Sequence, residues 1–256
     1  MAIHPTAVID DAAELRPDVE VGPYAVIGPN VKIGAGTVIG SHVYIHKNTT
    51  IGRDCHIWKG ASLGTDSQDL KFHGQTTYLV VGDRTMIREY ATLNRATTEG
   101  SATRVGDDCF LMAYTHVAHD CVLGNNIILS NAVNMAGHVT IGDHATISGL
   151  TCIHQFVQIG MHSFIGGGSR VPKDVPPFVM AVGNPIMLNG LNSVGLQRKG
   201  FSEEVRQELK RAYKIFFRSQ YNISQALEKA RSELKQLPEI KFFNDFIAHS
   251  ERGVIV

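Results

Sequence analysis

The stretch VEVGPYAVIGPNVKIGAGTVIG, residues 19–40, repeats one pattern every six residues. In Val-Lys-Ile-Gly-Ala-Gly, residues 31–36, a small apolar residue precedes an aliphatic residue by two positions, and a glycine follows. Strand alternation points both apolar side chains to the same side, and glycine permits a tight corner. A hexapeptide repeat of this kind predicts a parallel β-helix.

Aliphatic or methionine residues keep to the same six-residue grid from Ile3 to Val171, and only Asp69, Gln75 and Glu99 break it. With 43% of the chain apolar, chance does not produce such a run. Three short faces closing a triangle need eighteen residues per coil. Residues eighteen apart should therefore lie one above another, at the inter-strand distance of about 4.8 Å.

Two segments, 64–80 and 94–104, leave the grid and are predicted to be loops extruded from the β-helix, where solenoids often build their binding sites. A proline-rich exit follows Val171 and runs to Pro185. We expect an all-β solenoid over residues 1–185 and a small α-helical domain over 186–256, which can cap the open end of the solenoid.

Helical periodicity predicts three helices in the second domain. The first starts after Ser202, a plausible N-cap followed by two glutamates in the first turn. A second is expected over 223–237, and a third after Pro238.

Composition excludes several classes of protein. The formal net charge is zero, which argues against a general nucleic-acid binder. No apolar stretch reaches the roughly 18 residues of a membrane span, and the N-terminus lacks the basic start and apolar run of a signal peptide. We therefore expect a cytoplasmic protein without stable membrane insertion.

The four cysteines indicate neither a disulfide framework nor a zinc site. Cys55, Cys109 and Cys121 each stand two residues before a grid position, where other coils carry Ala, Val or Thr. Cysteine there is a small apolar filler, and no pair has CxxC spacing. A covalent cysteine nucleophile is therefore not expected.

The eighteen-residue coil places His119, Gly137 and Gln155 in one column and Asp120, His138 and Phe156 in the next. A base, an acid that orients it and a glycine amide able to polarise an oxyanion suit acyl transfer to a hydroxyl. The alternative is a polar ladder that satisfies itself on the solenoid surface.

A metal site is the second alternative. His116, His119, His138 and His144 could bind zinc across a trimer interface, as in the hexapeptide-repeat carbonic anhydrases, but their spacing differs from the histidine pair of those enzymes. We expect no metal.

Specific motifs now point to a family. The run Thr-His-Val-Ala-His-Asp-Cys (115–121), with Ala-Gly-His-Val (136–139) and Ile-His-Gln-Phe (153–156), resembles the UDP-N-acetylglucosamine acyltransferases, which act first in lipid A synthesis. Gln-Asp-Leu-Lys (68–71), Arg-Lys-Gly-Phe (198–201) and Ser-Glu-Arg-Gly (250–253) match as well, so the resemblance covers essentially the whole chain.

The resemblance implies a left-handed β-helix. The sequence alone would not predict this handedness, because connections between parallel strands are nearly always right-handed. It implies a homotrimer with sites between subunits. The expected reaction is direct transfer of an (R)-3-hydroxyacyl group to the 3-hydroxyl of a UDP-sugar. The donor is acyl-phosphopantetheine on acyl carrier protein, and no other cofactor is expected.

The same resemblance assigns roles to residues. His119 would be the general base, Asp120 its orienting partner and Gly137 the oxyanion donor. Gly167 falls where the family limits acyl length, and glycine leaves room for a longer chain. The remaining residues are implied to line the sugar, diphosphate and nucleotide sites: Gln68, Asp69, Lys71, His116, His138, His154, Gln155, Asn192, Arg198 and Lys199.

Three departures from the family pattern leave the acceptor open. They are Val194 in place of a glutamate, Asn94-Arg95-Ala96 in place of His-Arg-Gly, and Pro185 in place of a histidine. The 3-amino sugar analogue stays an alternative acceptor. So do other hexapeptide acyltransferases, including the lipid A N-acyltransferase, although that enzyme usually carries a domain before its repeats and the grid here begins at Ile3. A non-enzymatic scaffold would not need the His119 column.

A basic stripe is the last feature. Residues 206, 210, 214 and 218 are spaced by four on the first predicted helix of the second domain. The stripe is a candidate dock for the acidic acyl carrier protein, and a solvated helix face is the alternative. Its members are Arg206, Lys210, Arg211, Lys214 and Arg218.

Overall fold

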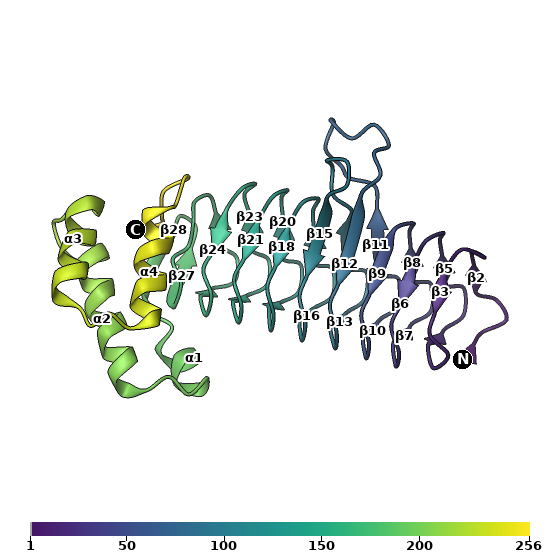
Figure 1. The fold of residues 1–256 in the computed structure, drawn as a ribbon, viewed down its shortest axis with the longest axis horizontal. Helices are drawn as coiled ribbons and strands as arrows, with labels where there is room; N and C mark the ends of the chain where they lie inside the picture. The colour runs from purple at the N-terminus through teal and green to yellow at the C-terminus, as the bar shows by residue number, and fades with distance from the viewer. Residues whose placement is uncertain (1) are drawn as a thin grey trace.

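The computed structural model describes residues 2–256 as a left-handed parallel β-helix followed by four helices (Figure 1). Within the described residues, the strands form three sheets, one per face of the triangular solenoid. The coil register is eighteen residues, as Ala2 opposite Glu20 shows, and it lengthens only where the two loops are inserted. The expected fold class is confirmed.

Most strands are two residues long and end on a grid residue. The first sheet contains β1 (Ala2–Ile3), β4 (Glu20–Val21), β7 (Val38–Ile39), β10 (His56–Ile57), β13 (Met86–Ile87), β16 (Phe110–Leu111), β19 (Ile128–Leu129), β22 (Thr146–Ile147), β25 (Phe164–Ile165), β27 (Val179–Gly183) and β28 (Ile186–Leu191). The second contains β2 (Val8–Ile9), β5 (Val26–Ile27), β8 (Tyr44–Ile45), β11 (Ser62–Thr65), β14 (Thr92–Asn94), β17 (His116–Val117), β20 (Asn134–Met135), β23 (Cys152–Ile153) and β26 (Arg170–Val171). The third contains β3 (Glu14–Leu15), β6 (Lys32–Ile33), β9 (Thr49–Ile51), β12 (Tyr78–Val81), β15 (Ala102–Val105), β18 (Val122–Leu123), β21 (Thr140–Ile141) and β24 (Gln158–Ile159).

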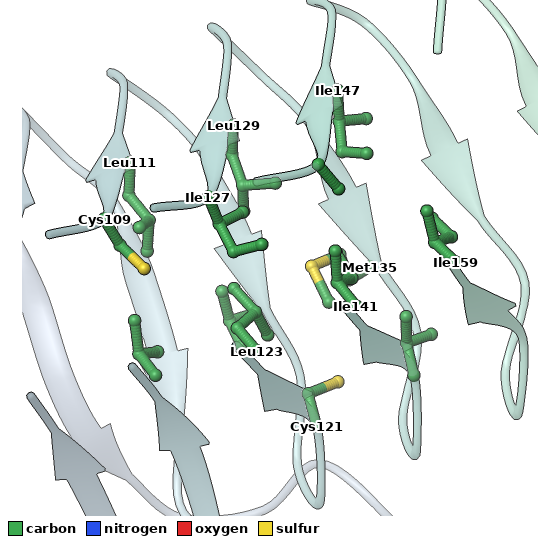
Figure 2. Close-up of a cluster of buried hydrophobic side chains, with 14 of the residues drawn as sticks. Cys109, Leu111, Cys121, Leu123, Ile127, Leu129, Met135, Ile141, Ile147 and Ile159 are labelled. Atoms are coloured by element: carbon green, nitrogen blue, oxygen red, sulfur yellow. The ribbon is translucent and has the colours of Figure 1, made fainter. Parts of the chain in front are cut away.

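The grid residues fill the interior of the solenoid (Figure 2). Cys109 and Cys121 lie beside Leu111 and Leu123 in this core, and both cysteines are fully buried, as is Cys55. Burial raises the pKa of the Cys109 thiol to about 11 and that of Cys121 to about 12. The filler role predicted for these cysteines is confirmed.

The corners of the solenoid are built differently from the expectation. Apart from Gly64 and Gly100 at the two loops, the glycines that follow a grid position do not adopt a positive φ. A Cβ on Gly34, for example, would lie 2.6 Å from the backbone of Gly52 in the next coil. That glycine therefore serves the close approach of coils. The left-handed conformation falls two residues later and is mostly adopted by residues other than glycine, with φ between 52° and 65°. Each such residue carries a conformational cost of about 1–2 kcal/mol that the stacked coils offset.

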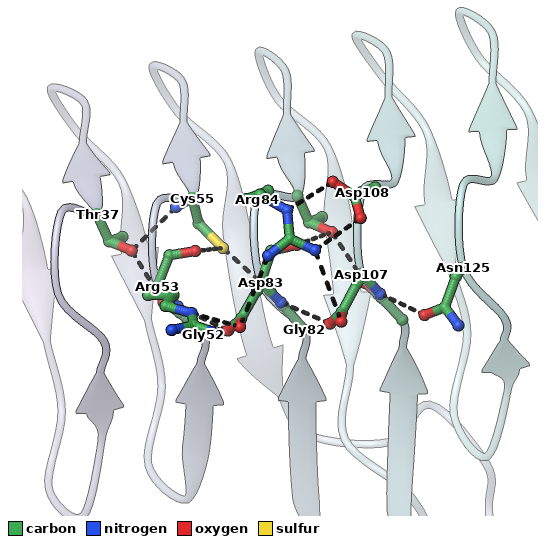
Figure 3. Close-up of polar contacts among 12 residues, drawn as sticks. Thr37, Gly52, Arg53, Cys55, Gly82, Asp83, Arg84, Asp107, Asp108 and Asn125 are labelled. Carbon is green, nitrogen blue, oxygen red and sulfur yellow. Dashed lines mark hydrogen bonds and ion pairs between the residues drawn. The ribbon is translucent and has the colours of Figure 1, made fainter.

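One corner carries a ladder of side-chain acceptors, drawn in Figure 3. At the second position after the grid residue the backbone N–H points along the stack. There Arg53 donates to the Asp83 carboxylate, Asp83 to Asp107, and Asp107 to the Asn125 amide oxygen, at 2.8–3.0 Å. A side chain from each next coil thus satisfies an N–H that the strand ladder leaves free.

The two extruded loops leave the same corner, between the second and third sheets, as Figure 1 shows beside β11, β12 and β15. They are slightly shorter than predicted, because β11 continues to Thr65 and β15 starts at Ala102.

The solenoid ends in a hairpin. The strand β27 pairs in parallel with β25, and β28 returns antiparallel to β27. The expected boundary at residue 185 falls in the turn of this hairpin, so the first sheet continues to Leu191. The tail folds back onto this end, where the buried carboxylate of Asp174 accepts a hydrogen bond from the Ser250 hydroxyl at 2.6 Å.

The helices are α1 (Ser193–Arg198), α2 (Glu203–Phe217), α3 (Ile223–Glu233) and α4 (Pro238–Ala248). The predicted Ser202 cap is confirmed, since its hydroxyl accepts from the Val205 N–H, and Pro238 is the first residue of α4. The one-and-a-half-turn α1 was not predicted. Among helices of the described residues, none combines the length and apolar character that a bilayer crossing requires.

Candidate active site

The corner between the second and third sheets stacks the predicted columns. The His138 N–H donates to the His119 carbonyl at 3.0 Å, and the Phe156 N–H donates to the Gly137 carbonyl at 3.1 Å. A Cβ built on Gly137 would lie 2.3 Å from His119 Cε1. The imidazole of His119 therefore lies flat over a position that only glycine leaves free, and the predicted neighbours are confirmed.

His119 is paired with Asp120. Its Nδ1 lies 2.9 Å from Asp120 Oδ2, and the two side chains are only 13% and 11% exposed. Burial opposes ionisation of Asp120, but hydrogen bonds from His119 and Thr97 outweigh it and hold its pKa below the usual value. An ionised Asp120 accepts, so Nδ1 carries the proton and Nε2 keeps its lone pair.

The second loop holds Asp120 in place. The Thr97 N–H donates to both carboxylate oxygens at 3.2 and 3.1 Å, and the Ser101 hydroxyl donates to Oδ1 at 3.3 Å. Thr97 Oγ1 also lies 3.1 Å from His119 Nδ1. The sequence offered no signal for these two residues beyond the break in the grid at Glu99.

A buried arginine joins the two loops at their base. Arg95 is fully buried and donates to the Gly64 carbonyl at 2.9 Å and to the Asp66 carboxylate at 2.5 Å. It also donates to His46 Nδ1 at 2.6 Å, and burial together with this cation lowers the pKa of His46. The amide of Asn94 adds a bond to the Asp66 carbonyl at 2.8 Å. Asn94 is therefore a loop brace and is only 2% exposed.

The Gly137 N–H is free. It occupies the same position in its six-residue repeat as the N–H groups of the ladder in Figure 3, although at a different corner of the solenoid, and Gln155 in the next coil does not accept from it. No hydrogen bond among residues 2–256 gives this N–H an acceptor. Because Gly137 lies against the His119 ring, its free N–H is a candidate donor to a developing oxyanion.

The first loop brings Asp69 to the histidines. One carboxylate oxygen of Asp69 and one ring nitrogen each of His119 and His138 lie within 4.8 Å of one another. The Lys71 N–H donates to Asp69 Oδ1 at 2.9 Å, while the side chains of Gln68 and Lys71 are exposed. Two of the predicted substrate residues, Asp69 and His138, thus lie beside the predicted base.

His116 and Phe156 flank this group. His116 Nδ1 lies 2.7 Å from Thr92 Oγ1, and burial, followed by His119, lowers its pKa. His138 stacks on Phe156 at 4.7 Å and meets His119 edge-on at 5.3 Å between ring centroids.

Comparison with known proteins shows which family the chain resembles over its whole length. Residues 174–255 match the model of the second domain of UDP-N-acetylglucosamine O-acyltransferase, and residues 30–65 and 102–137 match the bacterial transferase hexapeptide model. The chain is 46% identical to the acyl-[acyl-carrier-protein]–UDP-N-acetylglucosamine O-acyltransferase of Thiobacillus denitrificans over 254 residues, which are 99% of this chain and 98% of that protein. The UDP-N-acetylglucosamine O-acyltransferase of Moraxella catarrhalis superposes with a TM-score of 0.97 at 43% identity over 100% of both chains. The enzyme of Bacteroides fragilis gives 0.97 at 40% identity over 99% of both chains.

The chain belongs to the UDP-N-acetylglucosamine O-acyltransferase family.

Two other residues assigned from the family pattern, His154 and Gln155, lie on the same corner, two coils beyond His119. Both are exposed, and His154 Nδ1 lies 3.3 Å from Arg252 of the C-terminal tail. Gly167 follows β25 at the corner between the first and second sheets and is exposed.

The predicted nucleotide residues lie at the third corner, between the third and first sheets. The Asn192 side chain donates to the His162 carbonyl at 3.0 Å and caps α1 by accepting from Gly195. Arg198 and Lys199 are exposed at the end of α1. Burial is the main cause of the lowered pKa of His144 and of His162, and the charge of Lys199 adds to it. Within one chain, these residues and His119 lie at different corners.

The basic stripe divides into two sets. Arg206 pairs with Glu203 at 2.5 Å, and Arg211 pairs with Glu208 at 2.8 Å. Lys210, Lys214 and Arg218 instead line an open pocket of about 420 Å³ between α2 and β28.

Proposed function

We propose that this chain transfers an (R)-3-hydroxyacyl group from acyl carrier protein to the 3-hydroxyl of UDP-N-acetylglucosamine, the first step of lipid A biosynthesis. One observation supports this most directly. His119 is fixed by Asp120 through Nδ1, and its ring lies against Gly137, whose N–H is unpaired. A base and a free backbone donor thus belong to neighbouring residues of one corner.

The chemistry follows from these groups. His119 Nε2 takes the proton of the sugar 3-hydroxyl while the oxygen attacks the thioester carbonyl. The Gly137 N–H binds the oxyanion of the tetrahedral intermediate. The C–S bond then breaks, and the protonated His119 returns its proton to the phosphopantetheine sulfur. Asp120 stabilises the imidazolium between these steps.

Neither a covalent enzyme intermediate nor a resident cofactor is required. Cys121 is fully buried in the core, and its raised pKa leaves it a thiol at neutral pH. The acyl donor brings its own phosphopantetheine.

The separation of the corners supports a homotrimer. His119 and Asp69 lie at one corner, while Asn192, Arg198 and Lys199 lie at another. A second subunit that packs its third corner against the His119 corner would complete the site for the sugar and its nucleotide.

The pocket at α2 is the proposed dock for acyl carrier protein. Lys210, Lys214 and Arg218 face it without acidic partners among the described residues. Acidic partners are drawn to such a patch, and salt weakens the attraction.

Replacing His119 by alanine tests the mechanism. The loss of a general base should reduce kcat by about 10²–10⁴-fold with an unchanged oligomer. Full activity of His119→Ala would refute the assignment. Assays with both UDP-N-acetylglucosamine and its 3-amino analogue decide whether the product is an ester or an amide.

Charge reversal tests the dock. Lys210→Glu should raise the KM for acyl carrier protein about tenfold or more at low salt. The neighbouring Arg211→Glu, whose arginine is paired with Glu208, is the matched control and should change this KM less. Equal effects of the two substitutions would place the dock elsewhere.

A further inference from the structure

Three side chains at the active-site corner carry atoms that can bind a metal ion. We propose that Asp69, His119 and His138 bind one divalent transition-metal ion, with zinc as the best fit, and that this ion inhibits the enzyme. The binding part of the proposal is independent of the proposed function. The inhibition part rests on the role of His119 as the base.

The donor set fits zinc. Two imidazole nitrogens and one carboxylate oxygen lie within 4.8 Å of one another on partly buried side chains. Ligand atoms at about 2.1 Å from a tetrahedral zinc ion are about 3.4 Å apart, so a shift of about 1 Å closes the set. Asp69 stands on the first loop, where such a shift is least costly. Magnesium and calcium prefer all-oxygen ligands, and nitrogen donors select against them.

A second observation concerns the orientation of the ligands. Asp120 occupies Nδ1 of His119, so Nε2 is the nitrogen left to bind a cation. This carboxylate–histidine arrangement is the one that orients metal-binding histidines in general. Asp120 Oδ2 also lies 3.7 Å from His138 Nε2, which adds a second negative charge close to the ion.

Zinc and catalysis exclude each other in this arrangement. The lone pair that would bind the metal is the lone pair that would take the proton of the sugar hydroxyl. When Asp69 binds the metal ion, its carboxylate is no longer available to bind the sugar. Zinc should therefore compete with UDP-N-acetylglucosamine.

Calorimetric titration of the intact protein with zinc chloride, in a buffer free of chelators, tests the binding. We expect about one ion per chain. Asp69→Asn and His138→Gln should each weaken binding at least tenfold, and Asp120→Asn by about 10–100-fold. His73→Gln removes an exposed histidine from the same loop and should leave binding unchanged. Cobalt should give the intense visible absorption of a tetrahedral site in the wild type and lose it in Asp69→Asn.

Two outcomes would overturn the proposal. Wild-type affinity in both Asp69→Asn and His138→Gln, with native circular dichroism, would show that the ion binds elsewhere or not at all. Zinc that binds at these residues without being displaced by saturating UDP-N-acetylglucosamine would overturn the inhibition part. The loss of activity in His119→Ala tests the proposed function separately, because zinc affinity does not enter that assay.

Discussion

Replacing Gly137 by alanine places a methyl group where the His119 ring now lies. The new Cβ would be 2.3 Å from Cε1 and 2.6 Å from Nε2, whereas ordinary contact begins near 3.4 Å. The ring must therefore withdraw by about 1 Å. The backbone of Gly137 does not have a positive φ, so alanine itself is not strained there, and its N–H remains available.

A displacement of this size costs about 10²-fold in rate when it affects a reacting group. We expect kcat of Gly137→Ala to fall by about 100-fold, equivalent to about 2.7 kcal/mol of transition-state stabilisation. The melting temperature should change little, because His119 can rotate toward solvent.

A double-mutant cycle separates this cause from the oxyanion role of the amide. Steady-state rates would be measured for Gly137→Ala, His119→Ala and the double variant. If alanine acts by moving the ring, it adds nothing once the ring is gone. An undiminished hundredfold loss in the His119→Ala background would refute the steric explanation, as would wild-type activity of Gly137→Ala.

Two further predictions concern stability. Arg95→Lys cannot reach Gly64, Asp66 and His46 together, so the free energy of unfolding in urea should fall by about 1–3 kcal/mol and the KM for UDP-sugar should rise. Arg84→Lys, at an exposed pair with Asp108, should leave the free energy of unfolding nearly unchanged because solvent screens the pair, and equal losses would contradict the loop-anchoring role of Arg95. Burial, His144 and Lys199 lower the pKa of His162 to about 4, while Asp143 opposes them weakly. The pKa of His162 in the folded state lies below its unfolded value of about 6.5. The contribution of neutral His162 to the free energy of unfolding is therefore fully present above about pH 6.5. It is lost as the pH falls toward 4, by at most about 1.4 kcal/mol per pH unit. His162→Phe keeps the stacking on Phe178 and should flatten this slope; an unchanged slope in acid unfolding experiments would count against it.

The stacking of His119 and Gly137 could be predicted from the sequence because a regular coil converts sequence separation into spatial distance. His119 and Gly137 are eighteen residues apart, and nothing between them departs from the grid. The grid also predicted that Cys109 and Cys121 are core fillers, and both side chains are fully buried.

Contacts made by residues outside the six-residue grid could not be predicted from the sequence. Thr97 and Ser101 support Asp120 from a loop whose path no period describes, and Arg95 reaches back 29 residues to Asp66. Helical spacing also grouped Arg206 and Arg211 with the lysines, because spacing gives the face of a helix but not the partner that a side chain finds there.

The ladder of Asp and Asn acceptors has a consequence for how such sites can arise. Each six-residue repeat presents the same backbone donor after its grid residue, and at the ladder corner an Asp or Asn side chain from the following coil binds it. At Gly137, on another corner, the following coil supplies no acceptor, as is also the case at Asn131 and Gly149. A hexapeptide solenoid therefore holds a row of latent oxyanion sites, and losing one carboxylate can uncover a donor without moving the backbone. An oxyanion donor in such a fold can therefore arise by the loss of one side-chain acceptor, without any new backbone structure.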